Sequence, residues 1–412
     1  MHGGLRATSA CVLAVLALAG AGCGGNGDGG GPQEGPSTLT IYSSLPLHGV
    51  DRERSRDMVN AIKLALQESR GKIGPLSVTY VSLDSSTAED GVWTSDRVLD
   101  NARTAVRDLN AIAYIGDYDS AATALSLPLT NEGHILQVSP SSTYDGLTRP
   151  GGTRPAEPER FYPSGQRTFG RVVPADHVQA AALVGYMKTA GVRRLALLAD
   201  RDIFGEGLAD QIDTAASRQG IAVLDRDGID VRKRDLSDRA AEIAKLHADA
   251  FLFAGGASPG ATRIYKAVAA ADPSLLLFGP GAVADETFVR SLPAAAMRRM
   301  RVTGPMLPAR LLPPAARQFD DRFRTMFGRR PAPDALQAYE ATRVVLDSIR
   351  NAGSKGNDRR AVIDAFFATR DRSSVLGTYS IDRFGDTTLS TFGGDRMTRS
   401  GLVLDKVLKV KR

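Results

Sequence analysis

The sequence predicts an α/β protein with two lobes, each built around a doubly wound parallel sheet. Short apolar runs alternate with amphipathic helical segments from about residue 38 onward, and this order implies parallel strands joined by right-handed crossovers. A segment rich in proline, glycine and arginine, residues 149–167, interrupts the alternation, which restarts after Pro174. We therefore expect an irregular loop at a lobe boundary there and a second lobe of similar plan.

The apolar periodicity sets the expected elements of each lobe. In the first lobe we expect strands at 38–42, 76–81 and 111–115 and helices at 58–66 and 98–109. In the second lobe the expected strands are 195–198, 221–224, 250–253, 275–278 and one around Val302, and the expected helices are 178–187, 204–217, 236–246 and 264–271. Residues 313–351 are rich in helix signals, and the tail after residue 376 predicts short strands around a turn at 384–386.

Composition restricts the class of partner. Of the 412 residues, 42% are hydrophobic and 24% charged, which is typical of a globular chain with ample core. The net charge is +6, but the basic runs at 298–301 and 329–330 are short and not interleaved with aromatic side chains. We therefore expect no nucleic-acid partner.

The N-terminal residues predict export. Arg6 precedes an apolar run at residues 10–19 that suits the central region of a signal peptide. Residues 18–23 (Leu-Ala-Gly-Ala-Gly-Cys) resemble a bacterial lipobox, which implies cleavage after residue 22 and lipidation of Cys23. Gly20 stands where leucine is usual, and residues 19–21 could instead serve an ordinary signal peptidase that releases a soluble protein. Residues 23–37 are rich in glycine and predict a flexible tether.

The cysteine count agrees with this interpretation. Cys11 and Cys23 are the only cysteines of the sequence, so the body beyond residue 23 has neither a disulfide nor a thiol nucleophile. His48, His134 and His177 show no metal-ligand spacing, and we expect no cofactor or metal.

Two turns within residues 113–148 are the best candidates for a ligand site. Each follows an apolar strand and carries small hydroxylated residues, Ser120 in one and Ser141 to Thr143 in the other. Ligands bind beyond the carboxyl ends of parallel strands, where helix N-termini present N–H groups to anions, and Ala121 lies in such a first turn. The alternative is that these residues are ordinary helix caps and turn residues.

Several motifs, in this order, resemble the branched-chain amino acid-binding proteins, which are solute receptors of ATP-driven importers. They are Ile41-Tyr-Ser-Ser-Leu-Pro-Leu, Asn101-Ala-Arg-Thr-Ala, Tyr114-Ile-Gly, Pro128-Leu-Thr-Asn, Val138-Ser-Pro-Ser, Phe204-Gly-Glu-Gly-Leu and Leu376-Gly-Thr-Tyr-Ser. The resemblance implies the type I periplasmic-binding-protein fold, with three segments crossing between the lobes. It places 38–172 and 300–375 in lobe 1, and 173–299 and 376–412 in lobe 2. It also implies a small-molecule ligand, ABC permease subunits as partners and a place outside the cytoplasmic membrane.

The resemblance also implies site residues. Ser120 matches the serine that binds the ligand carboxylate, Ser141 and Thr143 match the pair after the next strand, and Phe204 stands where a tyrosine is frequent. Tyr42, Ala121, Asp119 and Asp202 complete the expected set. Gly281 occupies the position of the acid that holds the ligand ammonium, and Ala257 that of an aromatic residue. Asp117, Asp119, Asp202 and Asp285 are the candidate replacements for that acid, and we expect a small polar solute, anionic or zwitterionic.

Two alternatives remain open. Residues 256–260 (Gly-Ala-Ser-Pro-Gly) match the nucleophile elbow of serine hydrolases, but no histidine follows Ser258, because the last is His247. We therefore expect no enzyme. The same lobes could also present ligand to a membrane signalling partner in place of an importer.

Overall fold

The computed structural model describes residues 37–150, 154–283, 286–305, 307–399 and 401–411 of the protein. The expected signal peptide, Cys23 and almost all of the expected tether lie outside these residues. None of the helices in the described part of the chain is long and apolar enough to cross a membrane.

The first lobe is built on a six-stranded sheet with the strand order β2-β3-β1-β4-β5-β6. β1 lies between β3 and β4 and runs parallel to both, and the order places a topological switch point between β1 and β4. The strands are β1 (Thr38–Leu45), β2 (Lys72–Ile73), β3 (Leu76–Asp84), β4 (Ala111–Gly116), β5 (Leu136–Ser139) and β6 (Phe169–Arg171).

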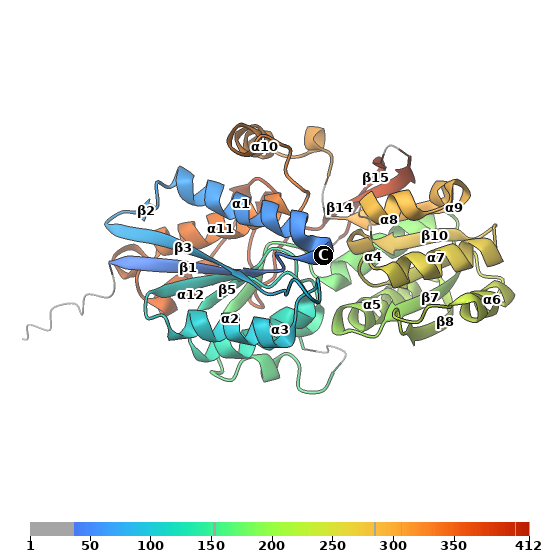
Figure 1. Ribbon diagram of the computed structural model, residues 1–412, viewed down its shortest axis with the longest axis horizontal. Coiled ribbons are helices and arrows are strands. Elements are labelled where there is room, and N and C mark those ends of the chain that lie inside the picture. The colour runs from blue at the N-terminus through green and yellow to red at the C-terminus, as the bar shows by residue number, and fades with distance from the viewer. Residues whose placement is uncertain (1–36, 151–153, 284–285, 306, 400, 412) are drawn as a thin grey trace, which may run out of the picture. The chain divides into compact units, whose positions relative to one another are not determined.

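The second lobe contains a seven-stranded sheet with the order β15-β14-β11-β10-β9-β7-β8. Its five parallel strands follow the same spatial order as β3-β1-β4-β5-β6 of the first lobe. β14 extends the sheet antiparallel to β11, and β15 pairs antiparallel with β14 at the edge. The strands are β7 (Arg194–Asp200), β8 (Ala222–Ile229), β9 (Ala250–Ala254), β10 (Leu276–Pro280), β11 (Met300–Gly304), β14 (Thr391–Thr398) and β15 (Gly401–Lys409). The expected α/β class with two parallel-sheet lobes is confirmed (Figure 1).

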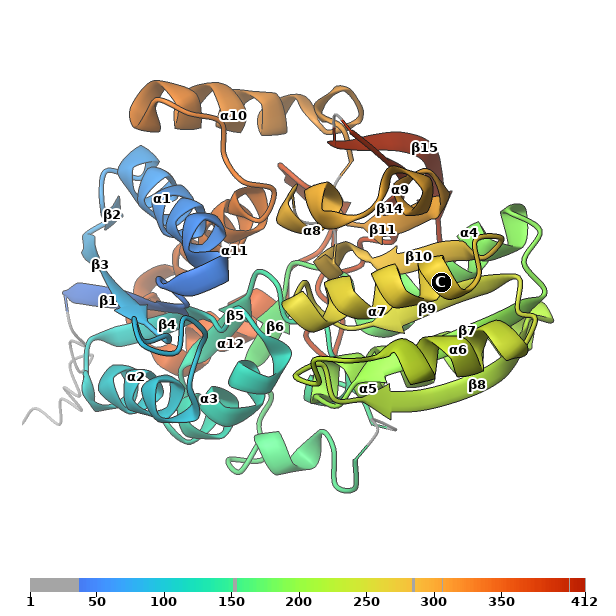
Figure 2. The ribbon, with the colours of Figure 1, turned by 45° about the vertical axis from the view of Figure 1, so that its right-hand side comes forward.

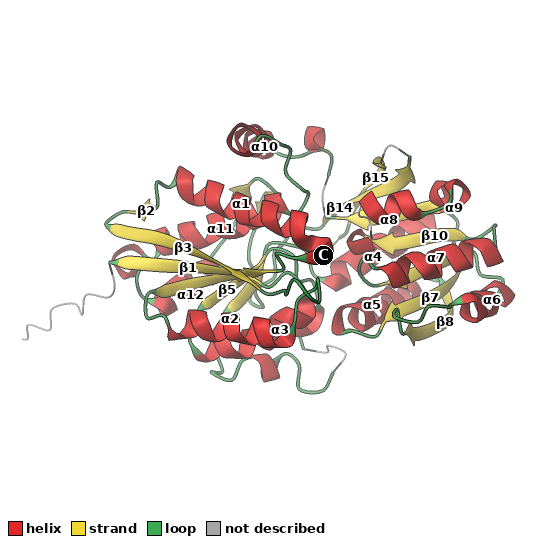
Figure 3. Ribbon diagram, in the orientation of Figure 1, coloured by secondary structure: helices red, strands yellow, loops and turns green. Residues whose placement is uncertain are grey.

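Helices cover both faces of each sheet (Figure 3). The first lobe has α1 (Arg52–Glu68), α2 (Ser95–Arg107), α3 (Ser120–Glu132), α10 (Pro314–Phe327), α11 (Ala335–Asn351) and α12 (Arg359–Phe367). The second has α4 (Asp176–Thr189), α5 (Ile203–Gln219), α6 (Ser237–Lys245), α7 (Pro259–Ala271), α8 (Glu286–Ser291) and α9 (Ala294–Arg299). Figure 2 shows α6 and α7 together on one face of the second sheet, and the buried residues of α4 and α5 form a separate core with the sheet.

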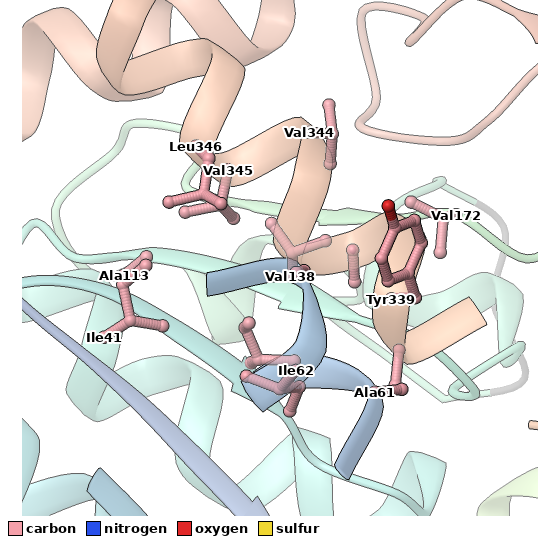
Figure 4. Packing of buried hydrophobic residues seen from close by; sticks show 14 of the residues in the cluster. Ile41, Ala61, Ile62, Ala113, Val138, Val172, Tyr339, Val344, Val345 and Leu346 are labelled. Carbon is pink, nitrogen blue, oxygen red and sulfur yellow. The ribbon is translucent and has the colours of Figure 1, made fainter. Parts of the chain in front are cut away.

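Aliphatic side chains fill the core of the first lobe between α1, α11 and the sheet. Ile62 of α1 and Val345 of α11 are fully buried with Ile41 of β1 and Val138 of β5 (Figure 4). Because parallel strands are buried on both faces, they consist of nearly continuous apolar runs, and this explains why the alternation was visible in the sequence.

Helix ends follow local capping rules. The side chain of Thr94 accepts the N–H of Arg97 at the start of α2, and the side chain of Asp358 accepts that of Ala361 at the start of α12. α5 ends at Gln219 and is capped by Gly220, whose φ of 73° lies in the left-handed region that glycine adopts without steric cost.

The chain passes between the two sheets three times: after β6, between β11 and α10, and before β14. The chain was expected to return to the first lobe at residue 300. Residues 300–304 instead form β11 of the second sheet, so the chain returns only after this strand. Residues 376–389 were expected in the second lobe, yet Tyr379 of β13 (Gly377–Tyr379) and Ile381 lie in the core of the first. β13 pairs with β12 (Arg372–Ser374) in a short hairpin. The segment at 149–167 precedes β6, which still joins the first sheet, so the chain leaves that sheet after Arg171, next to the expected boundary at residue 172.

Candidate functional site

A pocket of about 390 Å³ lies at the carboxyl ends of the strands of both sheets. The turns after β4 and β5 contribute Ser120 and Ser141 from the first lobe, and the residues after β7 and β10 contribute Asp202 and Gly281 from the second. This is the edge at which open parallel sheets bind ligands.

The hydroxyl groups of the first-lobe turns bond to the protein itself. Ser120 Oγ accepts the backbone N–H groups of Thr143 and Tyr144 at 3.1 and 3.2 Å, and so ties the two turns together. Ser141 Oγ donates to the carbonyl oxygen of Tyr118 at 2.6 Å. The proton of Ser141 and the N–H groups of Thr143 and Tyr144 are therefore already engaged, whereas Ser120 Oγ keeps its own proton.

Two aspartates occupy the same position on two helices. Asp119 caps α3, with Oδ1 accepting the N–H of Ala121 at 2.7 Å, and Asp202 caps α5, with Oδ1 accepting the N–H of Gly205 at 2.6 Å. Burial and then the negative charge of Asp202 raise the pKa of Asp119 to about 7. Burial also raises the pKa of Asp202, against the opposing effect of the N–H of Gly205. The two carboxyl groups thus share one electrostatic environment, although they belong to different lobes.

Further acids line the same pocket. Burial and the charge of Asp202 raise the pKa of Asp200, at the end of β7, to about 6. Asp51 and Asp334 also line it, together with Arg54, whose Nε lies 2.7 Å from Oδ2 of Asp334. Carboxylates are therefore in excess among the described residues of this site.

The comparisons with known proteins agree with this architecture. The family model for periplasmic binding proteins matches residues 39–388. This chain belongs to the periplasmic binding protein family. Membership implies an extracytoplasmic location and the role of a binding protein, and the predicted resemblance to the branched-chain amino acid-binding proteins of type I fold is confirmed.

Individual relatives span most of this periplasmic binding protein. It is 26% identical over 289 residues to the Leu/Ile/Val/Thr-binding protein of Salmonella typhimurium, covering 68% of this chain and 70% of that one. It is 23% identical over 370 residues to the Leu/Ile/Val-binding protein BraC3 of Rhizobium johnstonii, covering 86% of this chain and 90% of that one.

Solved structures share its fold. A leucine-binding protein from Thermotoga maritima has a TM-score of 0.77 at 21% identity, covering 90% of this chain and 99% of that chain. A solute-binding protein from R. palustris in complex with benzoate has a TM-score of 0.74 at 18% identity, covering 91% and 98%.

The structure brings most of the predicted site residues of this periplasmic binding protein to one pocket. The predicted residues that line it are Ser120, Ser141, Thr143, Asp119, Asp202 and Phe204. Ala121 is absent from the lining, and its N–H donates to Asp119.

Tyr42 is not brought to the pocket. Its hydroxyl donates to Oδ2 of Asp108, which precedes β4 at the opposite end of the sheet. Asp117 is fully buried, with Ser126 Oγ donating to its carboxylate, and does not line the pocket. Asp285 lies outside the described residues.

Gly281 has a steric reason to be glycine. A Cβ atom at this position would lie 2.8 Å from the carbonyl oxygen of Thr303 and 3.0 Å from Cα of Gly304, so even alanine would require the backbone to shift. An acid at this position would not fit this arrangement of β10 and β11. The carboxylates of the pocket belong to other positions of the chain, namely Asp51, Asp119, Asp200, Asp202 and Asp334.

Sequence reasoning missed Asp200, Arg54 and Gln337, all of which line the pocket. Asp200 ends a predicted strand as Asp117 does, so the rule used for the other turns could have found it. Arg54 and Gln337 lie on α1 and α11, far along the chain from the turns, and no local pattern points to them.

The hydrolase alternative gains no support from Ser258. Its Oγ accepts the N–H of Ala261 at 3.0 Å and caps α7, which is the ordinary role of serine at a helix start. His48 and His177 pair with Asp84 and Asp145. In the described part of the chain, no cluster of three or more His, Cys, Asp or Glu side chains could hold a metal ion.

Proposed function

We propose that this protein is the solute receptor of an ABC importer, which closes its two lobes around a small polar solute and delivers it to the permease subunits. The observation that carries the proposal is the pocket itself, because residues of both lobes line it at the carboxyl ends of their strands. Closure of the lobes would complete the binding site only when the solute bridges them.

The solute would engage residues of both lobes. Ser120, Ser141 and Thr143 face it from the first lobe, and Asp202 and Phe204 from the second. Phe204 is half-buried at the start of α5 and offers an aromatic surface beside the carboxylates. A solute with a polar group and an apolar portion matches this mixed lining.

Isothermal titration calorimetry of the purified protein against amino acids, amines and aromatic acids tests solute binding. We expect at least one solute to bind with a dissociation constant in the micromolar range or below. Small-angle X-ray scattering of the same complex should show a smaller radius of gyration. The absence of binding across the panel, together with ester hydrolysis that Ser258→Ala abolishes, would contradict the proposal.

Uptake experiments test delivery. Cells lacking the gene should lose uptake of the identified solute, and the restored gene should recover it. Normal uptake without the protein would favour the alternative of a ligand-sensing receptor for a membrane signalling partner.

We also propose that Cys23 carries the lipid that holds the receptor at the outer face of the cytoplasmic membrane. Labelling with a palmitate analogue should mark the wild-type protein and not Cys23→Ser, which should be recovered in the soluble fraction. An unlabelled wild-type protein in the soluble fraction would favour the ordinary signal peptidase.

A further inference from the structure

The helix N-termini that would hold an anion are already occupied by carboxylates of the protein. The first-turn N–H of Ala121 donates to Asp119, and the first-turn N–H of Gly205 donates to Asp202. An anionic solute at either helix would have to displace or approach a negative charge that is already in place. Of the anionic and zwitterionic solutes expected from the sequence, the geometry therefore disfavours the anionic ones.

The two serines near these helices differ in what they can offer a solute, because Ser120 Oγ accepts two backbone N–H groups and keeps its proton. Ser141 Oγ has committed its proton to the carbonyl oxygen of Tyr118, so it can only accept a further hydrogen bond. The N–H of Thr143 is likewise engaged by Ser120 Oγ. Ser141 can thus accept one hydrogen bond and Ser120 can donate one, so the preference for a donor-rich solute depends on the carboxylates and on Gln337.

The charge of the pocket points the same way. Five of the described residues that line it are aspartates, namely Asp51, Asp119, Asp200, Asp202 and Asp334, whereas Arg54 alone carries a permanent positive charge. Arg54 forms its salt bridge with Asp334. Among the described residues, no basic side chain forms a salt bridge with Asp119 or Asp202, whose partners are backbone N–H groups. A bound cation would provide the missing counter-charge.

An independent feature of the pocket also requires a donor. Gln337 of α11 lines it and is only 3% exposed, and none of the described groups donates to its Oε1. A buried amide oxygen without a partner costs about 1–3 kcal/mol. Because this oxygen is covered, an N–H group of a solute would remove that cost only once the Gln337 side chain turns toward the pocket. Gln337 lies on α11, whereas the two aspartates cap α3 and α5, so it would accept a hydrogen bond from a different side of the solute.

We propose that the solute is a small organic cation with N–H donors, such as an ammonium or guanidinium group, held between Asp119 of the first lobe and Asp202 of the second, with Gln337 Oε1 accepting another N–H. This inference rests on the proposed function. Because the two carboxylates belong to different lobes, a cation between them neutralises their repulsion and favours closure. The carboxylate pair thus supplies both selectivity and part of the closing force.

Titration calorimetry of the full chain with arginine, putrescine, leucine and benzoate tests the charge of the solute. We expect arginine or putrescine to bind more tightly than benzoate by at least tenfold. Asp119→Asn and Asp202→Asn should each weaken binding of the cation by at least tenfold, since asparagine still caps a helix but carries no charge. Asp358→Asn is the matched control, because Asp358 caps α12 through Ala361 in the same way and does not line the pocket. This control should leave the affinity unchanged.

Proton release gives a readout that a purely structural role would not affect. At pH 7 the carboxyl group of Asp119 is partly protonated, and it faces Asp202 of α5 and Asp51 of η1 (Gly49–Asp51), with Arg54 of α1 in the same lining. A cation should therefore expel a fraction of a proton, measured from the binding enthalpy in two buffers of different ionisation enthalpy. Asp119→Asn should abolish most of this release.

The outcomes are distinguishable. Tighter binding of benzoate than of either cation, or cation affinity within twofold of wild type in both Asn variants, would overturn the inference and leave the proposed function intact. Failure of every panel solute to bind would count against both. Thermal unfolding of each variant shows whether a lost affinity comes from a lost fold.

Discussion

The ring of Tyr144, in the first lobe, lies against Gly207 of α5 in the second. A Cβ atom at Gly207 would lie 2.4 Å from Cε2 of that ring, closer than side-chain contacts allow. Tyr144 cannot easily move away, because it is 1% exposed and its hydroxyl donates to Glu157. Ile203 lies about one turn before Gly207 on the same helix and belongs to the same apolar cluster as Tyr144, so α5 meets the first lobe along a packed surface.

Gly207→Ala should therefore separate the lobes at this contact. We expect ligand binding to weaken by about 1–3 kcal/mol, the usual cost of overpacking, because the closed form would lose this contact. Titration calorimetry and scattering of the ligand complex measure the effect. Gly185→Ala is the control: a Cβ there meets nothing within 4 Å, and alanine within a helix stabilises by about 0.5–1 kcal/mol. Equal affinity in both variants would show that the Tyr144 contact is irrelevant to closure.

Ser120→Ala should affect both stability and binding. The substitution leaves the partly buried N–H of Thr143 and the buried N–H of Tyr144 without their acceptor, so the free energy of unfolding should fall by about 1–3 kcal/mol. Ligand affinity should fall as well, because the turn with Thr143 loses its tie to α3. Urea unfolding monitored by circular dichroism measures the first effect. Ser237→Ala, at the exposed start of α6, should change stability by no more than about 0.5 kcal/mol. A similar change in both variants would contradict the structural role of Ser120.

The sequence was sufficient to predict the class of fold and the region of the site. Buried parallel strands leave continuous apolar runs, and small hydroxylated residues after β4 and β5 mark the edge at which ligands bind. Both signals are local, so Ser120, Ser141 and Thr143 could be predicted to lie together.

The chemistry of the site depends on contacts that are not local. Ser120 Oγ accepts the backbone N–H of Thr143, which is 23 residues away in the sequence. This pairing decides which hydrogen bonds the Ser120 hydroxyl can still make with a solute. The electrostatic coupling of Asp119 with Asp202 links two lobes. The assignment of Tyr42 to the site failed for the same reason, since its hydroxyl reaches Asp108, 66 residues away. No periodicity in the chain specifies such pairs.

Asp386→Asn should strongly lower the free energy of unfolding, because Asp386 pairs with Arg171 at the end of β6. Arg171, at the end of β6, is 0% exposed, and its Nε lies 2.8 Å from Oδ1 of Asp386, while Arg149 contacts the other oxygen. Removal of the charge leaves a buried guanidinium without its counter-ion, which costs about 3–5 kcal/mol. Asp100→Asn breaks the exposed pair with Arg103 and should cost about 0–1 kcal/mol. Denaturant unfolding compares the two, and equal losses would contradict the importance of burial.

The carboxyl group of Asp176 should make stability fall as the pH rises. Burial and then the negative charge of Asp145 raise the pKa of Asp176 to about 8, with Arg171 opposing and Asp202 adding to the shift. In the unfolded chain the pKa returns to about 3.9, so between about pH 4 and pH 8 the folded state retains a proton that the unfolded state has lost. The stabilisation is complete below pH 4 and is lost progressively up to pH 8, by up to about 1.4 kcal/mol per pH unit. Asp176→Asn cannot ionise, so its stability relative to wild type should rise from pH 5 to pH 8, as measured by urea unfolding at each pH. A constant difference between the two proteins over this range would mean that Asp176 is ionised in the folded state throughout.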